Sequence, residues 1–316
     1  MRARALSKWS VGAASLALGL ALSSPAFAFC RTRTCQPKKE NCPPRDPTQP
    51  RLGCTDSGKE LFRKSSCVSF NVQELGSPRR GIDGELFEQI VRDAFDRWLN
   101  ADCGGGAHPS IAAESLGTVS CNEVQYNCTH GNANIFLFED ENWTATDAAD
   151  AYALTTVWFV PSSGEIRDVD VEINGTQSQL DWDNPRDGVN LPSIVTHEVG
   201  HFLGLAHSPE DASAVMRWQY DYQSDDLRTL TADDIAGICA IYPPDRAVSS
   251  DDCSPRNGLA SDCGPGDGTH CAASSSSSGC CSTAPGRPEP LAVLALSAFA
   301  SASVIARGRR KKRNSG

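Results

Sequence analysis

The chain has 316 residues, and its 29 Lys and Arg against 39 Asp and Glu give a formal net charge of −10. Ten of the basic residues and one acid lie at the two ends, so residues 29–286 keep 19 basic and 38 acidic residues. A net charge of −19 over this body argues against nucleic acid as a partner, because the phosphate backbone would be repelled.

The first 28 residues have the features of a secretory signal peptide. Three basic residues precede a mostly apolar stretch over residues 11–22, and Ala26-Phe27-Ala28 supplies small residues at the usual cleavage spacing. We therefore expect an exported protein, either extracellular or associated with the cell surface or outer membrane.

The C-terminal end carries a second sorting feature. Residues 291–306 contain no charged side chain and are followed by six basic residues between Arg307 and Arg313. Sixteen residues are short for a membrane span, and the basic cluster should stay cytoplasmic. We expect residues 285–316 to form a sorting or membrane-anchor tail, through which alone the protein contacts a membrane.

Fourteen cysteines in an exported chain predict disulfide bonds. Cys121 and Cys128 are close enough in sequence for a local bridge, and the other pairings stay open. Residues 29–59, rich in Cys and Pro, predict an N-terminal extension held by disulfides. Residues 245–284, rich in Ser, Gly and Cys, predict a flexible stalk.

Residues 60–244 have the apolar patterning of a packed domain, with ample length for one core. Strands are expected at 68–72, near Ile111, at 135–138, and in a hairpin of 154–160 and 166–173. Helices are expected at 85–99, where apolar residues recur at three-and-four spacing, after the N-cap Asn190, and from Thr231 to the stop at Pro243.

A metal site is indicated by the segment HEVGHFLGLAH. His197 and His201 are four residues apart, which on a helix places both imidazoles on one face. Hydrolytic zinc needs three protein ligands and an open position for water. Gly204 can end the helix and turn the chain back, so that His207 supplies the third ligand. We predict one catalytic zinc ion.

Glu198 follows the first histidine and is the expected general base. Zinc lowers the pKa of a bound water to about 7, so a carboxylate suffices to deprotonate it and to pass the proton to the leaving amine. A bare HExxH can occur in a helix by accident. Five fixed positions in eleven residues, inside an amphipathic helix with a glycine stop, favour the metal site.

This segment, continued by Ser208, resembles the metzincin clan of zinc peptidases. Ser208 and Asn190-Leu191 are similar to the matrixin branch. Met216 matches the methionine turn beneath the metal in that clan, with ordinary core packing as the alternative. The resemblance covers residues 65–244 and implies an α+β fold. That fold has a twisted, mixed five-stranded sheet with one antiparallel edge strand and about three helices.

The same resemblance implies a monomeric metalloendopeptidase with polypeptide substrates, which would pair with the edge strand 154–160. Two other functions stay open. One is a zinc-containing surface binding protein or inactive peptidase homologue, and the other is zinc hydrolysis of a non-protein substrate.

The chain departs from the animal matrixins, which carry a second, structural zinc. Thr156 and Arg167 stand where its histidines are expected, so we predict no zinc there. Calcium near Asp168, Asp170 or Glu172 is one hypothesis, and solvated or hydrogen-bonded carboxylates are the alternative.

Latency and sorting also differ from those of the animal enzymes. The cysteine-containing latency motif is absent, and a cysteine of the extension capping the zinc is a minor alternative. Arg217-Trp218 departs from the usual Tyr-Pro, which leaves the specificity pocket unpredicted. The tail, with Gly279-Cys280-Cys281, resembles the myxobacterial C-terminal sorting signal. That resemblance implies cleavage near the cysteines and retention at the cell surface, against a simple tail anchor.

Overall fold

The computed structural model describes nine ranges of the chain: residues 29–35, 42–44, 54–143, 151–177, 180–181, 188–209, 211–220, 226–266 and 292–300. The predicted signal peptide lies outside these ranges. So do residues 267–284 of the predicted stalk and all of the predicted tail except 292–300.

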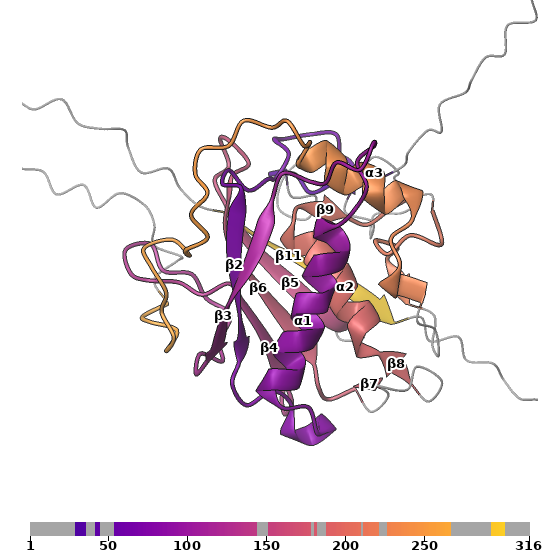
Figure 1. Ribbon diagram of the computed structural model, residues 1–316. Helices are drawn as coiled ribbons and strands as arrows, with labels where there is room; N and C mark the ends of the chain where they lie inside the picture. The colour runs from indigo at the N-terminus through magenta and orange to yellow at the C-terminus, as the bar shows by residue number, and fades with distance from the viewer. Residues whose placement is uncertain are drawn as a thin grey trace, which may run out of the picture.

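A mixed five-stranded sheet forms the centre of the domain (Figure 1). Its strands follow the order β3 (Ala112–Val119), β2 (Cys67–Gln73), β4 (Ile135–Glu139), β6 (Ile166–Asn174) and β5 (Ala151–Phe159). The first four are parallel, and β5 runs antiparallel to β6. The predicted α+β fold with one antiparallel strand is confirmed.

Two further strands extend this sheet beyond β5. The strand β11 (Ala292–Ala300) pairs antiparallel with the outer edge of β5, from Ala292 opposite Phe159 to Phe299 opposite Ala151. The short strand β10 (Gln219–Tyr220) pairs parallel with β11. The chain therefore places part of its own C-terminal region between β5 and the segment that follows Met216.

Three α-helices lie where the sequence predicts them: α1 (Gly84–Leu99), α2 (Leu191–Phe202) and α3 (Ala232–Ile241). Asp83 caps α1 by accepting from the Leu86 amide, and Thr231 and Asp234 form a capping box at the start of α3. Helices α1 and α2 pack together over the sheet, with α1 in front of the strands in Figure 1.

An aromatic cluster joins both helices to the sheet. Phe95 of α1 stacks on Phe70 of β2 at 4.7 Å between ring centroids and meets Phe202 of α2 edge-on at 5.1 Å. Phe202 in turn stacks on Phe136 of β4 at 5.8 Å. Trp98 of α1 donates from Nε1 to the Thr196 carbonyl over 2.8 Å. These contacts fix α2, which carries the histidine motif, against the buried core.

Short elements complete the described part of the chain. They are the 3-10 helices Pro78–Arg80 and Asp226–Arg228, and the strand pairs β1 (Cys30–Arg31) with β9 (Leu205–Ala206) and β7 (Leu180–Asp181) with β8 (Val189–Asn190). Among the described residues, no helix combines the length and apolar character that a membrane crossing needs.

Disulfides connect distant parts of the chain. Among the described residues these pairs are Cys30–Cys54, Cys35–Cys42, Cys67–Cys253, Cys103–Cys239 and Cys121–Cys263. The expected local bridge between Cys121 and Cys128 is therefore wrong, because a partner 142 residues away lies nearer in space. Cys128 is disulfide-bonded as well.

The first part of the predicted stalk is attached to the domain. Cys253 and Cys263 are bonded to Cys67 and Cys121 of the central domain. The Arg246 guanidinium donates to the carbonyls of Arg63, Ser65 and Ser110 at 2.8–2.9 Å. Residues 245–266 thus differ from the flexible segment that their composition predicts.

The acidic residues of β6 lie on the face opposite the helices. Asp170 is fully buried and accepts from the amides of Gln125 (2.9 Å) and Ile135 (3.0 Å). Burial raises the pKa of Asp168 and of Asp170. Burial, and then nearby Glu139, raises the pKa of Glu172 to about 7.

The shifted pKa of Glu172 makes stability depend on pH. The folded state holds this proton more tightly than the unfolded chain, whose value is 4.5, so unfolding free energy falls as pH rises through about 7. Between pH 5 and pH 8 we expect the unfolding free energy of the parent to fall by about 2 kcal/mol more than that of Glu172→Gln. Urea unfolding of both proteins at the two pH values measures this, and equal losses would contradict the shift.

Candidate metal centre

Three histidine side chains converge at the C-terminal end of α2. His197 and His201 come from the helix, and His207 comes from the chain directly after β9. Nε2 of His201 lies 3.1 Å from Nε2 of His197 and 3.2 Å from Nε2 of His207. Their exposed fractions are 0%, 0% and 4% in chain order. The structure thus brings all three predicted ligands together.

The spacing of these nitrogens fits zinc. A tetrahedral site with Zn–N bonds of 2.0–2.1 Å holds its ligand atoms about 3.3 Å apart. Nδ1 of His197 faces the Val215 carbonyl at 2.6 Å, and Nδ1 of His201 faces the Leu205 carbonyl at 2.9 Å. These acceptors assign the proton to Nδ1, so the Nε2 lone pair of each ring is directed at the common point.

Burial also sets the charge of the rings. It lowers the pKa of His197 to about 3, with a further lowering from His207. Burial lowers the pKa of His201 well below its ordinary value, and the two neighbouring histidines add to this. The imidazoles of His197 and His201 are therefore neutral near pH 7, which is the form that binds a metal ion.

The end of α2 depends on a glycine. The helix ends at Phe202, and Gly204 has a backbone φ of +106°, in the region that favours glycine. A Cβ at this position would also lie 3.0 Å from the Leu61 carbonyl oxygen. Both the conformation and the close approach of Leu61 require glycine, and the reversed chain delivers His207 to the other two ligands.

Met216 packs directly against α2. A Cβ on Gly200 would lie 2.2 Å from the Met216 Sδ, so the thioether occupies the space that a side chain there would need. The Met216 carbonyl accepts from the Ser208 amide over 2.7 Å, which ties the methionine to the residue after the third ligand.

Asp234 holds the same loop from the other side. Its carboxylate accepts from the amides of Val215 (2.8 Å), Met216 (3.1 Å) and Thr231 (2.8 Å). Because the Val215 carbonyl orients His197, the start of α3 is linked to a predicted metal ligand. The sequence identifies Asp234 as a helix cap, and nothing in its local pattern indicates the contacts with the loop.

Glu198 is fully buried beside the ligands. Thr155 of β5 donates from its hydroxyl to the Glu198 carboxylate oxygen Oε2 over 2.5 Å. This contact joins the expected base to the strand along which a substrate would lie. Thr155 escaped the sequence analysis because a threonine in a strand gives no signal that separates it from its neighbours.

No further set of three histidines or carboxylates gathers in the described ranges. Arg167 pairs with Glu165 at 2.9 Å, and His108 Nδ1 faces the Ala101 carbonyl at 3.1 Å. The other described cluster of ligand-type residues is Cys67, Glu114 and Cys253, whose two sulfurs are bonded to each other. The idea that a cysteine of the extension caps the zinc is wrong, since all four form disulfides.

The family model described as Matrixin matches residues 119–243. This region contains the three histidines, Glu198 and Met216. Human neutrophil collagenase is 31% identical over 199 residues, which are 61% of this chain and 37% of the collagenase. Metalloendoproteinase 1-MMP of Arabidopsis thaliana is 45% identical over 67 residues, or 20% of this chain and 17% of that protein.

Human matrix metalloproteinase-20 is 44% identical over 63 residues, which are 20% of this chain and 13% of that protein. The chain thus spans less than two fifths of the length of these relatives. The family match and the convergent histidines together support a metzincin-like metallopeptidase.

Asp234 offers a test of how the loop supports the ligands. Asp234→Ala would leave buried amides of Val215 and Met216 unpaired, and we expect a loss of about 3 kcal/mol in unfolding free energy. Asp234→Asn, which keeps one carbonyl oxygen as acceptor, should lose about half as much. Urea unfolding measures both, and an Asp234→Ala protein as stable as the parent would contradict the assigned role.

Proposed function

We propose that this chain is an exported zinc endopeptidase that cleaves extended polypeptide segments with Glu198 as the general base. The observation that carries the proposal is the convergence of three buried imidazoles on one point, beside a buried carboxylate. The matrixin match over residues 119–243 supports the same chemistry.

Each residue of the site has a separate role in the proposed hydrolysis. His197, His201 and His207 would hold the zinc, with a fourth position left for solvent. When bound, the ion supplies Lewis-acid polarisation of the scissile carbonyl and lowers the pKa of water to about 7. Glu198 accepts the proton of the attacking water and delivers it to the leaving amine. Thr155 holds the carboxylate in place through its hydroxyl.

The outer edge of β5 supports an extended substrate. A strand edge offers unpaired amides and carbonyls to a peptide that adds to the sheet. The edge of β5 is able to accept such a strand, because β11 pairs with it over most of its length. Thr155 lies on this same strand and contacts Glu198, so a peptide on the edge would pass the base.

The role of Glu198 is tested by Glu198→Ala. Removing the general base should lower turnover by at least about 100-fold, while the three imidazoles still bind one zinc. The measurement combines kcat/KM on an unfolded protein substrate with zinc content of the purified protein. The parent should lose activity to a chelator and regain it with zinc.

Two outcomes would contradict this function. A zinc-loaded Glu198→Ala protein that cleaves like the parent would exclude Glu198 as the base. A parent that binds zinc fully, yet cleaves no member of a peptide library, would favour the inactive homologue or surface binding protein.

The C-terminal strand gives a further prediction. Because β11 pairs with the edge that a substrate needs, it should compete with substrate at the high effective concentration of a tethered segment. We expect a chain ending at Pro290 to cleave peptides with kcat/KM about tenfold higher than the full chain.

The matched control is the full chain carrying Leu294→Pro and Leu296→Pro, which removes two backbone donors from β11 without shortening the chain. It should match the shortened chain. Equal kcat/KM for all three proteins would show that β11 does not compete with substrate.

Export and cell-surface retention are part of the proposal. The disulfides support folding in an oxidising compartment. The mass of the native protein tests cleavage after Ala28 and near Cys280, against an intact tail anchor.

Calcium binding at Asp168 or Asp170 is tested by isothermal titration calorimetry. The absence of binding heat would contradict it.

A further inference from the structure

The first described residues of the chain lie against the turn that carries the third zinc ligand. Strand β1 pairs antiparallel with β9, with Cys30 opposite Ala206 and Arg31 opposite Leu205. The two residues of β9 are the only ones between Gly204 and His207 in the sequence. A segment about 175 residues away in sequence thus fixes the path of the backbone into the third ligand.

Thr32 reaches the same turn through two hydrogen bonds. Its amide donates to the Gly204 carbonyl, and its hydroxyl donates to the Leu205 carbonyl, both over 2.9 Å. The Leu205 carbonyl also accepts from Nδ1 of His201. Buried Thr32 therefore orients the acceptor that holds the ring of a metal ligand.

The disulfide between Cys30 and Cys54 lies beneath the third ligand. Cys54 Sγ is 3.4 Å from the carbonyl oxygen of His207. Both cysteines are buried in one cluster with Ala206 of β9, and Trp218, two residues after Met216, packs against it. The sulfur–sulfur bond thus joins the strand that pairs with β9 to the residue that contacts the His207 backbone.

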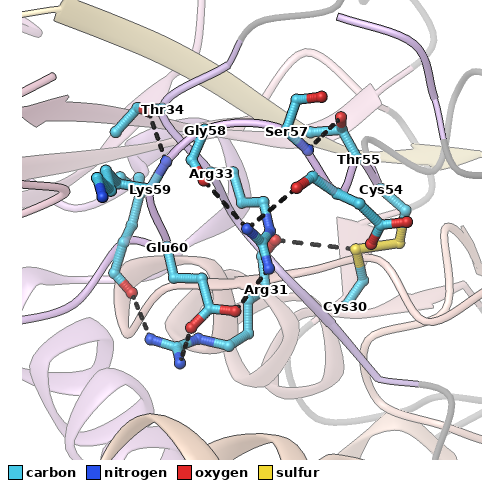
Figure 2. A network of polar contacts seen from close by, with 12 residues as sticks. Cys30, Arg31, Arg33, Thr34, Cys54, Thr55, Ser57, Gly58, Lys59 and Glu60 are labelled. Carbon is cyan, nitrogen blue, oxygen red and sulfur yellow. Dashed lines mark hydrogen bonds and ion pairs between the residues drawn. A yellow bond between two sulfur atoms is a disulfide. The ribbon is translucent and has the colours of Figure 1, made fainter.

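The segment is itself anchored to the domain, as Figure 2 shows around Glu60. Glu60 pairs with Arg31 and, at 2.6 Å, with Arg33. The Leu61 amide donates to the Thr32 carbonyl over 2.8 Å, and Arg31 donates to the Leu61 carbonyl over 3.3 Å. Leu61 is the residue whose carbonyl closely approaches Gly204. The turn at Gly204 is therefore contacted by Thr32 and by Leu61, and these two residues are hydrogen-bonded to each other.

We propose that Thr32 and the Cys30–Cys54 disulfide are positioning residues for the zinc ligands His201 and His207. This rests on the zinc site of the proposed function. The helix fixes the backbone of His197 and His201, whereas the Leu205 carbonyl that orients the His201 ring and the backbone of His207 belong to residues 203–207, which the N-terminal segment supports. Breaking this support leaves the ligands free to separate and weakens metal binding, while the helices and the sheet stay folded.

The test compares four variants of the full chain with the parent. Thr32→Val removes the hydroxyl and keeps the shape of the side chain, and Thr32→Ser restores the hydroxyl. Cys30→Ser with Cys54→Ser removes the disulfide under His207. Its matched control is Cys35→Ser with Cys42→Ser, which removes the other disulfide of the same extension.

Zinc dissociation constants come from competition with a chromophoric chelator, and the Co²⁺ absorption spectrum reports ligand geometry. We expect Thr32→Val and loss of the Cys30–Cys54 bond to weaken zinc binding by about tenfold to 100-fold and to alter the Co²⁺ spectrum. Thr32→Ser and loss of the Cys35–Cys42 bond should leave both readouts near those of the parent. Urea unfolding of the metal-free proteins measures fold stability separately.

Two results would overturn the inference. If the parent binds zinc and Thr32→Val binds it equally tightly, the segment does not position the ligands, even where unfolding free energy falls. If the variant that lacks the Cys30–Cys54 bond fails to fold, the zinc affinity of Thr32→Val alone decides the test. If the parent binds no zinc, the proposed function fails together with the inference.

Discussion

Convergence of three imidazoles on one point is the constraint on which the rest of the structure depends. One helical turn brings His197 and His201 together, but the third ring arrives only because the chain reverses at Gly204. A reversed backbone has few hydrogen bonds of its own, so neighbouring segments must supply them. In this molecule the N-terminal segment supplies them, since the amide and hydroxyl of Thr32 donate to the carbonyls of Gly204 and Leu205.

The supports act on carbonyl groups rather than on the ligands themselves. The Val215 carbonyl orients His197, and the Asp234 carboxylate fixes the amides around it. The Leu205 carbonyl orients His201, and Thr32 fixes that group. The rings of His197 and His201 are thus each held through one backbone acceptor, whose position is set by a residue distant in sequence. With Nδ1 of His197 and of His201 held in this way, the Nε2 atoms of both rings face the common point that Nε2 of His207 also approaches.

Local patterns were sufficient for much of this account. The three-and-four spacing in residues 85–99 and the alternation in 166–173 reflect one buried face, and both elements form where those patterns lie. The capping box at Thr231 acts over three residues and was equally visible. The three histidines are near one another along one helix and one turn, so their spacing predicted the convergence that the structure shows.

Long-range contacts were beyond the reach of such patterns. Cys121 has a cysteine seven residues away, yet its partner is Cys263, because the sheet brings that segment closer. The pairing of β1 with β9 and the bond from Thr155 to Glu198 join segments 43 residues or more apart. No periodicity or turn signal encodes these contacts, since they are settled by the packing of the whole domain. The pairing of β11 with β5 is a long-range contact of the same kind.

Zinc-edge X-ray absorption on the zinc-loaded protein tests the central claim most directly. The account predicts three imidazole nitrogens at about 2.0–2.1 Å and one or two oxygens from solvent. A sulfur scatterer at about 2.3 Å, or a fourth protein nitrogen in place of solvent, would contradict it.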